Sequence, residues 1–410
     1  MKTKLKLNLT RRKKHLIRLP PPHPNQQIIL ESSARFRVVA CGRRFGKTFV
    51  GLYAILAAAA RGQKCWWLAP TYAMSTDVWE QMQAVTAHLP GRRVYHTHRR
   101  LNFPGGGSIT VRSTHTPDNL RGAGLDFVVL DEAAFMPPTI WPEVVRPMLL
   151  DRRGGALFLS SPNGKNAFWH LYQMGVQRKR SWRHFHFTSA HNPLIDPAEL
   201  AVIRAQTPEH IWRAEYLAEF TDDLGQVFRG IHAAATAPLA AQPIPGARYV
   251  FGVDWGRTAD ATAIVVLDVS ARRMVALDRF TQLAWSHQRS RLRALYDHWQ
   301  PAVILAEANS IGSPNIEALQ AEGLPVRPFM TTQPTKADLI QSLSLAIERA
   351  ELALLPDEAL LGELAAYTVE ALPAGGYRYA APPGLHDDLV IATALAWYAL
   401  RYTGLPIAFA

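Results

Sequence analysis

A short stretch near the front of the chain combines a glycine-marked loop with a lysine and a hydroxyl residue. The stretch Val38–Val50 reads VVACGRRFGKTFV, which predicts a buried strand, a loop, and a helix that opens at Lys47 and Thr48. Backbone N–H groups in such a turn, with the positive end of the helix dipole, bind phosphate. The lysine would reach the β- and γ-phosphates, and the threonine hydroxyl would bind Mg²⁺. The usual first glycine is Cys41, with Gly42 following it, so this motif alone leaves a chance turn open.

Two carboxylates follow a continuous apolar run further along the chain. The run Leu125–Leu130 (LDFVVL) ends in Asp131 and Glu132. An aspartate at the end of an apolar strand can hold Mg²⁺, usually through water. The next carboxylate can polarise an attacking water. The pair could also be a helix cap, but its combination with the upstream GKT predicts a nucleoside triphosphatase.

Acidic residues also mark the ends of predicted elements in the back half of the chain. Asp254 ends a strand, Glu307 follows the apolar core of another, and Asp387 and Asp388 begin a helix, while Asp260 lies six residues after Asp254. Each acid alone has a structural explanation, because acids are stabilised at a helix N-terminus. Together, in a β-β-β-α-β-α order, they predict a nuclease with two hard divalent cations, as in-line phosphodiester hydrolysis requires.

Alternating strand and helix patterns must position the front-half groups. Buried strands are predicted at Lys64–Pro70, Leu125–Leu130 and Ala156–Leu159, the last ending in Ser160–Gly164, and a hairpin at Asn102–Val111. Ligands bind at the C-terminal edge of parallel α/β sheets. The front half is therefore predicted to be a parallel α/β sheet with its charged groups at that edge.

The back half begins with three β-rich runs, which indicate an antiparallel meander. These runs are Tyr249–Asp254, Ala261–Val269 and Arg273–Phe280. Short strands are predicted at Val303–Leu305 and after Pro325. Helices are predicted at His287–Trp299, Lys336–Ala350 and Asp357–Val369, and from His386 onward.

Length, composition and charge limit the class of protein. The chain has 410 residues and 48% hydrophobic content, enough for about two packed domains. No run approaches the roughly 18 apolar residues of a membrane span. The two cysteines, Cys41 and Cys65, form no disulfide framework, which favours a reducing cytoplasm.

The positive charge is concentrated in the front half. From Gly246 onward the chain holds 13 basic residues (Lys and Arg) and 17 acidic residues (Asp and Glu). The whole chain has 45 basic and 33 acidic residues, so the residues before Gly246 include 32 basic and 16 acidic ones. A basic front half favours a polyanionic partner such as nucleic acid, although a solvated basic surface would look the same. We expect a basic N-terminal arm at 1–24, a nucleotide-binding domain at 25–220, a linker at 221–246 and a nuclease domain at 247–410.

With both candidate sites in view, the chain resembles the large terminase subunit of tailed bacteriophages, the genome-packaging motor and nuclease. The resemblance covers nearly the whole chain, and the order of its motifs is more specific than any one of them. The motifs are GRRFGKT (Gly42–Thr48), APTY (Ala69–Tyr72), VVLDEA (Val128–Ala133), SSPNG (Ser160–Gly164), EYLAEF (Glu215–Phe220), GVDWG (Gly252–Gly256), Glu307 and HDDLV (His386–Val390).

The resemblance implies an additional-strand P-loop ATPase domain followed by a ribonuclease H-like nuclease domain. It implies ATP with Mg²⁺ in the first site and two Mg²⁺ or Mn²⁺ in the second. The cations would be held by Thr48 and Asp131 in the ATPase, and by Asp254, Asp260, Glu307, Asp387 and Asp388 in the nuclease. The implied ATP-binding residues are Gln26, Gly42, Arg43, Arg44, Phe45, Gly46, Lys47, Thr48, Asp131 and Ser160.

The resemblance also implies roles for single residues. Ser160 with Ser161 would sense the γ-phosphate. Gln26 would read the adenine edge, which its place ahead of the loop also allows, although a surface glutamine would look the same in the sequence. Arg121 resembles the arginine that some family members insert into a neighbouring subunit's site, with Arg43 and Arg44 as rivals acting in the same subunit. The implied partners are double-stranded DNA, a portal protein, a small terminase subunit and further copies in a ring, expected to be a pentamer. The implied location is the host cytoplasm, transiently at the procapsid portal vertex and not in the virion.

Two other classes of protein share part of this pattern. A helicase-nuclease would carry further helicase motifs, and a DDE-type recombinase has a ribonuclease H fold with three acids but seldom an intact ATPase in front. A non-catalytic prophage relic is disfavoured because Lys47, Glu132, Asp254 and Asp387 are all present.

Overall fold

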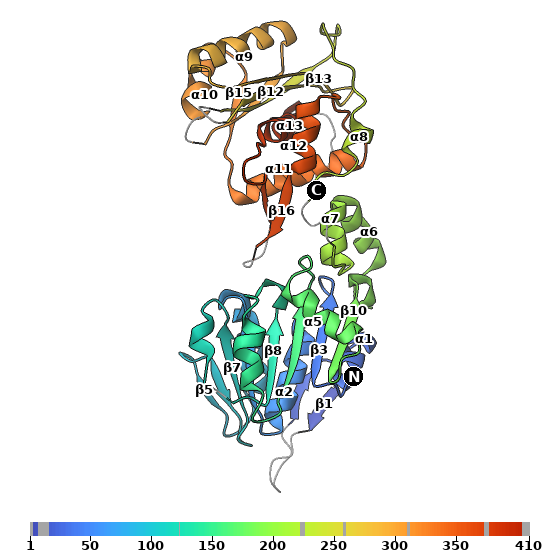
Figure 1. Ribbon diagram of the computed structural model, residues 1–410, viewed down its shortest axis with the longest axis vertical. Coiled ribbons are helices and arrows are strands. Elements are labelled where there is room, and N and C mark those ends of the chain that lie inside the picture. Colours follow the sequence, from blue (N-terminus) through green and yellow to red (C-terminus); the bar gives the residue numbers. More distant parts are fainter. Residues whose placement is uncertain are drawn as a thin grey trace. The chain divides into compact units, whose positions relative to one another are not determined.

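We describe the chain from a computed structural model, which describes residues 3–6, 16–122, 124–221, 226–256, 260–309, 312–372 and 377–403. The chain divides into two compact units, each described here by itself (Figure 1). The first unit comprises Met1–Val202, Ile211–Asp222 and Ala371–Gly376. The second comprises Ile203–His210, Asp223–Glu370 and Tyr377–Ala410.

The first unit is built on an eight-stranded sheet in the order β10-β3-β9-β8-β4-β7-β6-β5. In this order, all neighbouring strands from β10 to β7 pair in parallel, whereas the β7–β6 and β6–β5 pairs are antiparallel. The antiparallel β6–β7 pair is the predicted glycine hairpin. The strands are β3 (Phe36–Cys41), β4 (Lys64–Ala69), β5 (Arg93–Tyr95), β6 (Arg100–Asn102), β7 (Ser108–Ser113), β8 (Phe127–Asp131), β9 (Gly155–Ser160) and β10 (Trp182–Phe187).

Helices cover both faces of this sheet, so its strands are apolar on both sides. Along β3, Val39 and Cys41 join one core cluster, and Val38 and Ala40 join the other. The helices of this unit and of the segment that follows are α1 (Pro24–Glu31), α2 (Lys47–Ala60), α3 (Thr76–Thr86), the π-helix η4 (Ile140–Val145), α4 (Arg146–Met148), α5 (Ala167–Val176), α6 (Pro197–Gln206), α7 (Glu209–Ile211) and the π-helix η6 (Trp212–Tyr216).

The N-terminal segment differs from a free basic arm. Strand β1 (Thr3–Lys6) pairs antiparallel with β2 (Leu16–Leu19), and Ile17 and Leu19 are buried in the first unit's core. The apolar side chains of β2 explain the difference, because their burial anchors the segment. Helix α1 begins at Pro24 with His23 as its cap, so the proline-rich stretch starts a helix, as proline in a first turn allows.

The second unit is built on a five-stranded sheet in the order β13-β12-β11-β14-β15. The first three strands pair antiparallel, as the meander predicts, and β11, β14 and β15 pair in parallel. The strands are β11 (Tyr249–Asp254), β12 (Thr262–Asp268), β13 (Arg273–Phe280), β14 (Val303–Glu307), β15 (Val326–Phe329) and the separate hairpin β16 (Thr368–Ala371) and β17 (Tyr377–Ala380).

Helix α13 packs closely on this sheet. A side chain at Gly252 of β11 would collide with the backbone of Ala392 and Ala396 in α13, so glycine permits the approach. The helices of the second unit are α8 (Ile231–Ala234), α9 (Trp285–Trp299), α10 (Gly312–Ala321), α11 (Gln333–Glu348), α12 (Glu358–Ala366) and α13 (Asp388–Ala399).

Two sequence-based expectations differ from the structure here. The stretch expected as a linker over 221–246 contains Val227, Phe228 and Ile231, whose apolar side chains are buried in the second unit's core. The helix expected over Asp357–Val369 ends at Ala366, and β16 follows. A strand of β-branched and apolar residues is favoured there because it has β17 to pair with.

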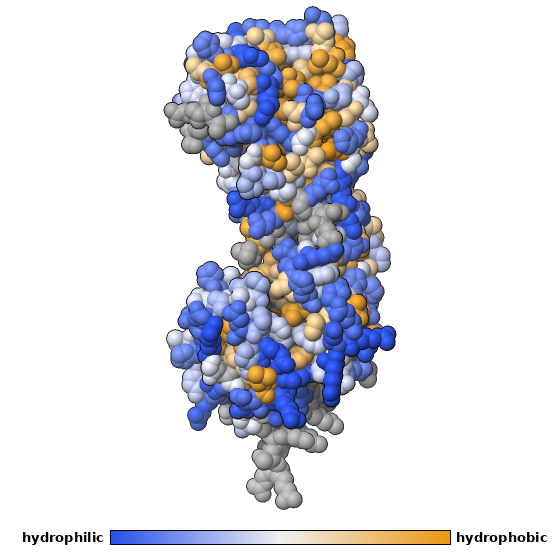
Figure 2. Space-filling model, in the orientation of Figure 1, coloured by the Kyte–Doolittle hydropathy of each residue, from blue (hydrophilic) through white to orange (hydrophobic). Residues whose placement is uncertain are grey.

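Figure 2 shows hydrophilic and hydrophobic residues interspersed over the visible face of each unit. Among the residues that the structure describes, none of the helices is long and apolar enough to cross a membrane.

Candidate functional site

The loop between β3 and α2 is held by its carbonyl oxygens. Four consecutive carbonyls accept hydrogen bonds from side chains outside the loop. These bonds run from Ser189 Oγ to Arg43 O (2.7 Å), from Asn192 Nδ2 to Arg44 O (2.6 Å), and from Gln26 Nε2 to Phe45 O (3.3 Å) and Gly46 O (3.4 Å). A trans peptide points its C=O and the following N–H in opposite directions. Tethering the carbonyls therefore turns several N–H groups toward the other side of the loop, where they can bind phosphate.

The backbone of the loop requires a glycine immediately before helix α2. Gly46 has φ +94°, a left-handed conformation that glycine adopts without a steric penalty. Phe45, predicted to contact ATP, has its side chain fully buried and stacked on Phe187 at 4.9 Å. Only its backbone is therefore available to a ligand at this loop.

Lys47, Glu132 and Ser160 form a connected chain across three elements. Lys47 Nζ lies 3.6 Å from Glu132 Oε1, and Ser160 Oγ donates to Glu132 Oε2 at 3.1 Å. Burial alone lowers the pKa of the Lys47 ammonium, but nearby negative charges, led by Glu132, leave that pKa raised. The lysine is therefore held as a cation at the first turn of α2, next to the loop.

Asp131 is a buried carboxyl group with an unused oxygen. Its Oδ1 has no hydrogen-bond partner among the described residues. Burial, and next the charge of Glu132, raise the pKa of Asp131 to about 7, while Lys47 acts in the opposite direction. A buried carboxylate oxygen without a partner is costly unless a cation or proton satisfies it. The group therefore fits the predicted Mg²⁺, and Thr48, in the first turn of α2, stays the predicted second ligand.

The three candidate arginines lie in different surroundings. Arg43 pairs with Glu215, with its Nε 2.9 Å from Oε2, and its backbone N–H also donates to the Glu215 carbonyl at 2.6 Å. Arg44 is exposed and has a left-handed φ of 61°. Arg121 is exposed and lies 3.4 Å from Asp118 and 4.0 Å from Glu143.

Gln26 lies on helix α1 and contacts the loop directly. Its side chain is buried, with the amide nitrogen on two loop carbonyls and the amide oxygen accepting from His23 N at 3.1 Å. These contacts show Gln26 as a tether of the loop. Its predicted reading of adenine stays a prediction.

Asp254 and Glu307 are neighbours because their strands are. Strands β11 and β14 run in parallel with Val253 opposite Ala306, so both carboxyls leave the same edge of the sheet. Burial most strongly, and then the charge of Glu307 and a hydrogen bond with it, raise the pKa of Asp254 well above its usual value. Two carboxyls this close need a shared proton or cations between them, which fits the predicted metal site.

Asp387 and Asp388 reach the same edge from the start of helix α13. Asp387 lies 3.2 Å from Lys336 Nζ on α11. Asp388 accepts from the backbone of Ala261 at 3.0 Å, and Arg279 lies 3.6 Å away. Burial raises the pKa of Asp388, whereas the Ala261 hydrogen bond and Arg279 act to lower it.

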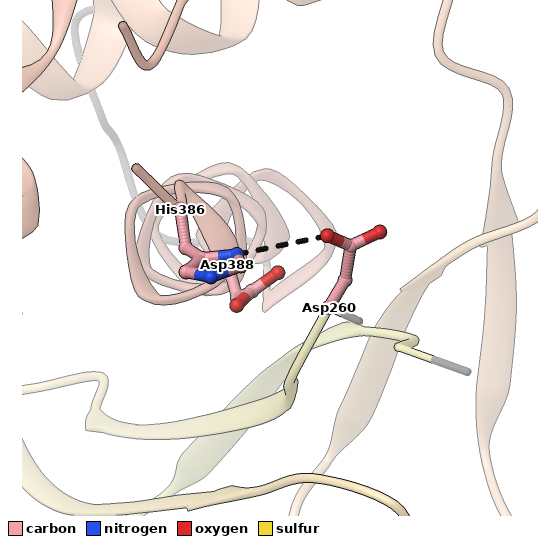
Figure 3. A group of neighbouring side chains, drawn as sticks. All are labelled: Asp260, His386 and Asp388. Atoms are coloured by element: carbon pink, nitrogen blue, oxygen red, sulfur yellow. Dashed lines mark ion pairs between the residues drawn. The ribbon is translucent and has the colours of Figure 1, made fainter. Parts of the chain in front are cut away.

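Asp260, His386 and Asp388 form a further group at this edge (Figure 3). One ligand atom from each lies within 4.8 Å of the others, and His386 Nδ1 is 3.6 Å from Asp260 Oδ1. Figure 3 shows the Asp260 carboxylate facing the His386 ring, with Asp388 beside it. Their imidazole and carboxylate groups are ligand types for divalent cations.

Several residues in contact with the sites were not singled out from the sequence. They are His23, Ser189, Asn192 and Glu215 around the loop, and Arg279, His386 and Glu363 around the acids, with the Glu363 carboxylate 3.4 Å from Arg279. Only His386 and Glu215 carried a usable signal, since both lie inside motifs quoted above, HDDLV and EYLAEF.

Comparison with known proteins assigns the family. Residues 39–234 match the family described as terminase large subunit, T4likevirus-type, N-terminal. The large terminase subunit of Thermus virus P23-45 is 31% identical over 427 residues, covering 92% of this chain and 87% of the relative. The chain belongs to the large terminase subunit family. The large terminase subunit of Thermus phage G20c is 30% identical, with the same coverage of both chains.

The fold of this terminase agrees with that of a solved relative. The large terminase of a thermophilic bacteriophage covers 93% of this chain and 99% of its own at 15% identity, with a TM-score of 0.55. The predicted fold class is confirmed: a P-loop ATPase domain is followed by a ribonuclease H-like nuclease domain. This terminase is an ATPase and a metal-dependent nuclease.

Proposed function

We propose that this terminase hydrolyses ATP at the β3–α2 loop to drive double-stranded DNA into a procapsid, and cuts concatemeric DNA at the second unit's acidic edge. The observation that carries the proposal is the Lys47–Glu132–Ser160 chain beside the buried Asp131. It joins a phosphate-binding cation, a candidate base and a polar sensor at one sheet edge. DNA and the packaging machinery are therefore its partners.

In the ATPase unit the residues divide the work of phosphoryl transfer. The loop N–H groups and Lys47 bind the β- and γ-phosphates and neutralise the transferring group. Glu132 orients and polarises the attacking water. Ser160, bonded to Glu132, changes its hydrogen bonding when the γ-phosphate leaves and so couples hydrolysis to movement.

Thr48 and Asp131 would hold the Mg²⁺ that accompanies ATP. When bound, that ion supplies charge stabilisation at the β- and γ-phosphate oxygens. The buried Asp131 oxygen without a partner supports this assignment. Arg121 would act on a neighbouring subunit's ATP, with Arg43 and Arg44 as rivals in the same subunit.

In the nuclease unit the carboxylates would hold two Mg²⁺ or Mn²⁺ ions. The proposed ligands are Asp254, Asp260, Glu307, Asp387 and Asp388. When bound, the cations supply stabilisation of the attacking and leaving oxygens of an in-line displacement. Lys336 orients Asp387 through their 3.2 Å contact, and Arg279 with the Ala261 amide orients Asp388.

The assembly that these activities imply is a ring of this chain, proposed as a pentamer, on a portal protein. A small terminase subunit would select the DNA, and Gln26 would contribute to adenine recognition. The complex would form in the host cytoplasm, transiently at the portal vertex.

The test is to incubate the purified protein with plasmid DNA, with and without Mn²⁺ and ATP, while ATP turnover is measured in parallel. We expect metal-dependent cutting and DNA-stimulated ATP hydrolysis. Cutting that persists in EDTA, or the absence of any ATP hydrolysis with DNA present, would contradict the proposal.

A further inference from the structure

A basic hollow lies at the edge of the ATPase sheet opposite the ATP site. It has a volume of about 480 Å³ and is lined at the starts of β3, β8 and β9 and by the C-terminal part of α2. In Figure 1 the starts of these strands are the ends that carry no arrowhead. Because the strands are parallel and ATP is predicted to bind at their C-terminal ends, this hollow is a separate place in the fold. Four of its lining residues are arginines: Arg35, Arg37, Arg61 and Arg153.

Arg37 lines the hollow with part of its guanidinium unused. Its Nη1 donates to the Ile29 carbonyl at 3.1 Å, and its Cζ lies 5.6 Å from the centre of the Phe127 ring. Its largely buried Nε has no hydrogen-bond partner among the described residues. Burial, and next the positive charge of Arg61, lower the pKa of Arg37 to about 10. A buried donor beside other cations is destabilising unless an anion completes its surroundings.

The acid of the hollow does not compensate these charges. Asp126 accepts a hydrogen bond from the Lys64 backbone N–H at 2.7 Å and forms an ion pair with Arg152 at 3.3 Å. Arg152 is not one of the four arginines that line the hollow. Arg35 is used structurally, because it donates to the carbonyls of Gly154 and Leu149. Arg37, Arg61 and Arg153 therefore remain as an excess of positive charge around one cavity.

The rest of the lining is apolar or aromatic apart from Gln63. Tyr53, Ala54, Ala57 and Ala58 on α2 and Phe127 on β8 form this wall. The cavity has the size of a small-molecule site. It combines guanidinium groups, whose planar forks match phosphate oxygens, with surfaces on which a flat ring can pack.

We propose that this hollow binds a nucleoside 5′-phosphate, either as a free nucleotide or as the terminal nucleotide of a DNA strand. Arg37, Arg61 and Arg153 bind the phosphate, and the Tyr53 side of the cavity packs against the nucleoside. A phosphate monoester suits the site better than a carboxylate, since its oxygens can accept from three guanidinium groups at once. This site is independent of ATP turnover and of the nuclease.

The first test is calorimetric titration of dAMP into the full-length protein and into Lys47→Ala, in which the β3–α2 loop has lost its phosphate-binding cation, so that binding retained in Lys47→Ala belongs to the hollow. We expect one binding event that weakens about tenfold or more in Arg37→Gln and in Arg61→Gln, since each loses a charge-assisted hydrogen bond. Arg180→Gln is the matched control: it removes one exposed arginine before β10 on the same sheet edge, and we expect less than about a twofold change. No dAMP binding, or equal weakening in Arg180→Gln, would overturn the proposal.

A folding defect is detected by thermal unfolding and ATP turnover of each variant. If Arg37→Gln does not fold, the proposal is tested with Arg61→Gln and Arg153→Gln instead. Both of these side chains are exposed, so we expect their replacement to leave folding intact. Unchanged dAMP affinity in that pair refutes the assignment.

The second test separates the two sources of the phosphate. A short duplex with 5′-phosphates, the same duplex without them, and free dAMP are compared on the wild type and on Arg61→Gln. Arg61-dependent preference for the phosphorylated duplex over dAMP identifies a DNA end as ligand, and the reverse preference identifies a free nucleotide. Equal binding of both duplexes with no Arg61 dependence contradicts the proposal for DNA ends.

Discussion

Glu132 is held in an uncommon backbone conformation, with φ 53° and ψ 48°. Its carboxylate is nevertheless fixed from two sides, by Lys47 at 3.6 Å and by Ser160 at 3.1 Å. Non-glycine residues in the left-handed region cost free energy and persist where the surroundings over-determine them. At the scale of the residue, this strain accompanies the position that the proposed mechanism uses as the base.

Replacing Glu132 should separate binding from turnover. In Glu132→Gln the side chain keeps its size but loses the charge that polarises water, so we expect kcat to fall by about 10²–10⁴-fold. Lys47 and the loop remain, and ATP binding should persist. Lys47→Ala should abolish hydrolysis through loss of the phosphate cation. Filter binding and steady-state kinetics check both, and near wild-type turnover in Glu132→Gln would remove it from the mechanism.

The nuclease acids make a matching prediction in the second unit. Asp254→Asn and Asp387→Asn each remove a charge at a site built to hold cations, so plasmid cutting should fall about 100-fold or more. ATP turnover should be unchanged. Asp297→Asn, an exposed acid on α9, is the control and should cut normally. Loss of ATPase activity in the two site variants would count against separate active sites.

At the scale of the element, the β3–α2 loop depends on side chains from distant parts of the chain. Ser189 and Asn192 follow β10, and Gln26 comes from α1. Strand β10 is adjacent to β3 in the sheet, which brings the tethers to the loop. The phosphate-binding conformation is thus held by tertiary contacts in addition to its own sequence.

Two tether variants distinguish holding the loop from reading the base. Asn192→Ala removes the Arg44 carbonyl contact and the hydrogen bond that Asn192 Oδ1 accepts from Leu194 N, and neither reads the base, so we expect KM to rise equally for ATP and GTP. If Gln26 also contacts adenine, Gln26→Ala should raise KM for ATP more than for GTP. Equal effects on both nucleotides would show that Gln26 holds the loop carbonyls and does not contact adenine.

The sequence identified the local elements and missed what depends on distant contacts. The GKT loop, the DE strand end and the meander follow from local patterns and agree with the structure. The roles of Ser189 and Asn192 could not be predicted, because their partners lie 146 and 148 residues away. The first two residues of β16, Thr368 and Val369, were assigned to a helix for the same reason, since the pairing with β17 is not visible in the strand's own residues.

At the scale of the whole molecule, one buried histidine should make stability depend on pH. His210 is 2% exposed, and its ring nitrogens have no hydrogen-bond partner among the described residues. Burial, and next the charge of Arg229, lower the pKa of His210 to about 4.

The folded protein therefore keeps His210 neutral, whereas the unfolded chain takes up a proton near pH 6.5. Because the unfolded chain then binds a proton that the folded protein does not, the free energy of unfolding falls as pH drops from 6.5 toward 4. The total loss from His210 is about 3 kcal/mol, and above pH 6.5 there is none. Urea unfolding between pH 7 and 4 should show a shallower decline in His210→Phe. His298→Gln, on the exposed side of α9, should follow the wild type, and identical slopes in all three proteins would exclude His210 as the cause.

The proposed ring gives a prediction for Arg121. If Arg121 acts on a neighbour's ATP, Arg121→Ala should bind ATP without hydrolysing it. Mixing it with Glu132→Ala should restore part of the activity, because some interfaces then pair an intact Arg121 with an intact Glu132. No restoration under conditions where the ring assembles would place the arginine in the same subunit, as Arg43 or Arg44.

The segment 203–210 belongs to the second unit, although the residues on both sides of it belong to the first. Within that unit, the backbone N–H of Glu209 donates to the Glu348 carboxylate at 3.0 Å. A protease that cut the chain at 222–225 would therefore sever the polypeptide without releasing either product. The N-terminal piece would keep a part of itself embedded in the C-terminal one, and the two should elute together until denaturant is added.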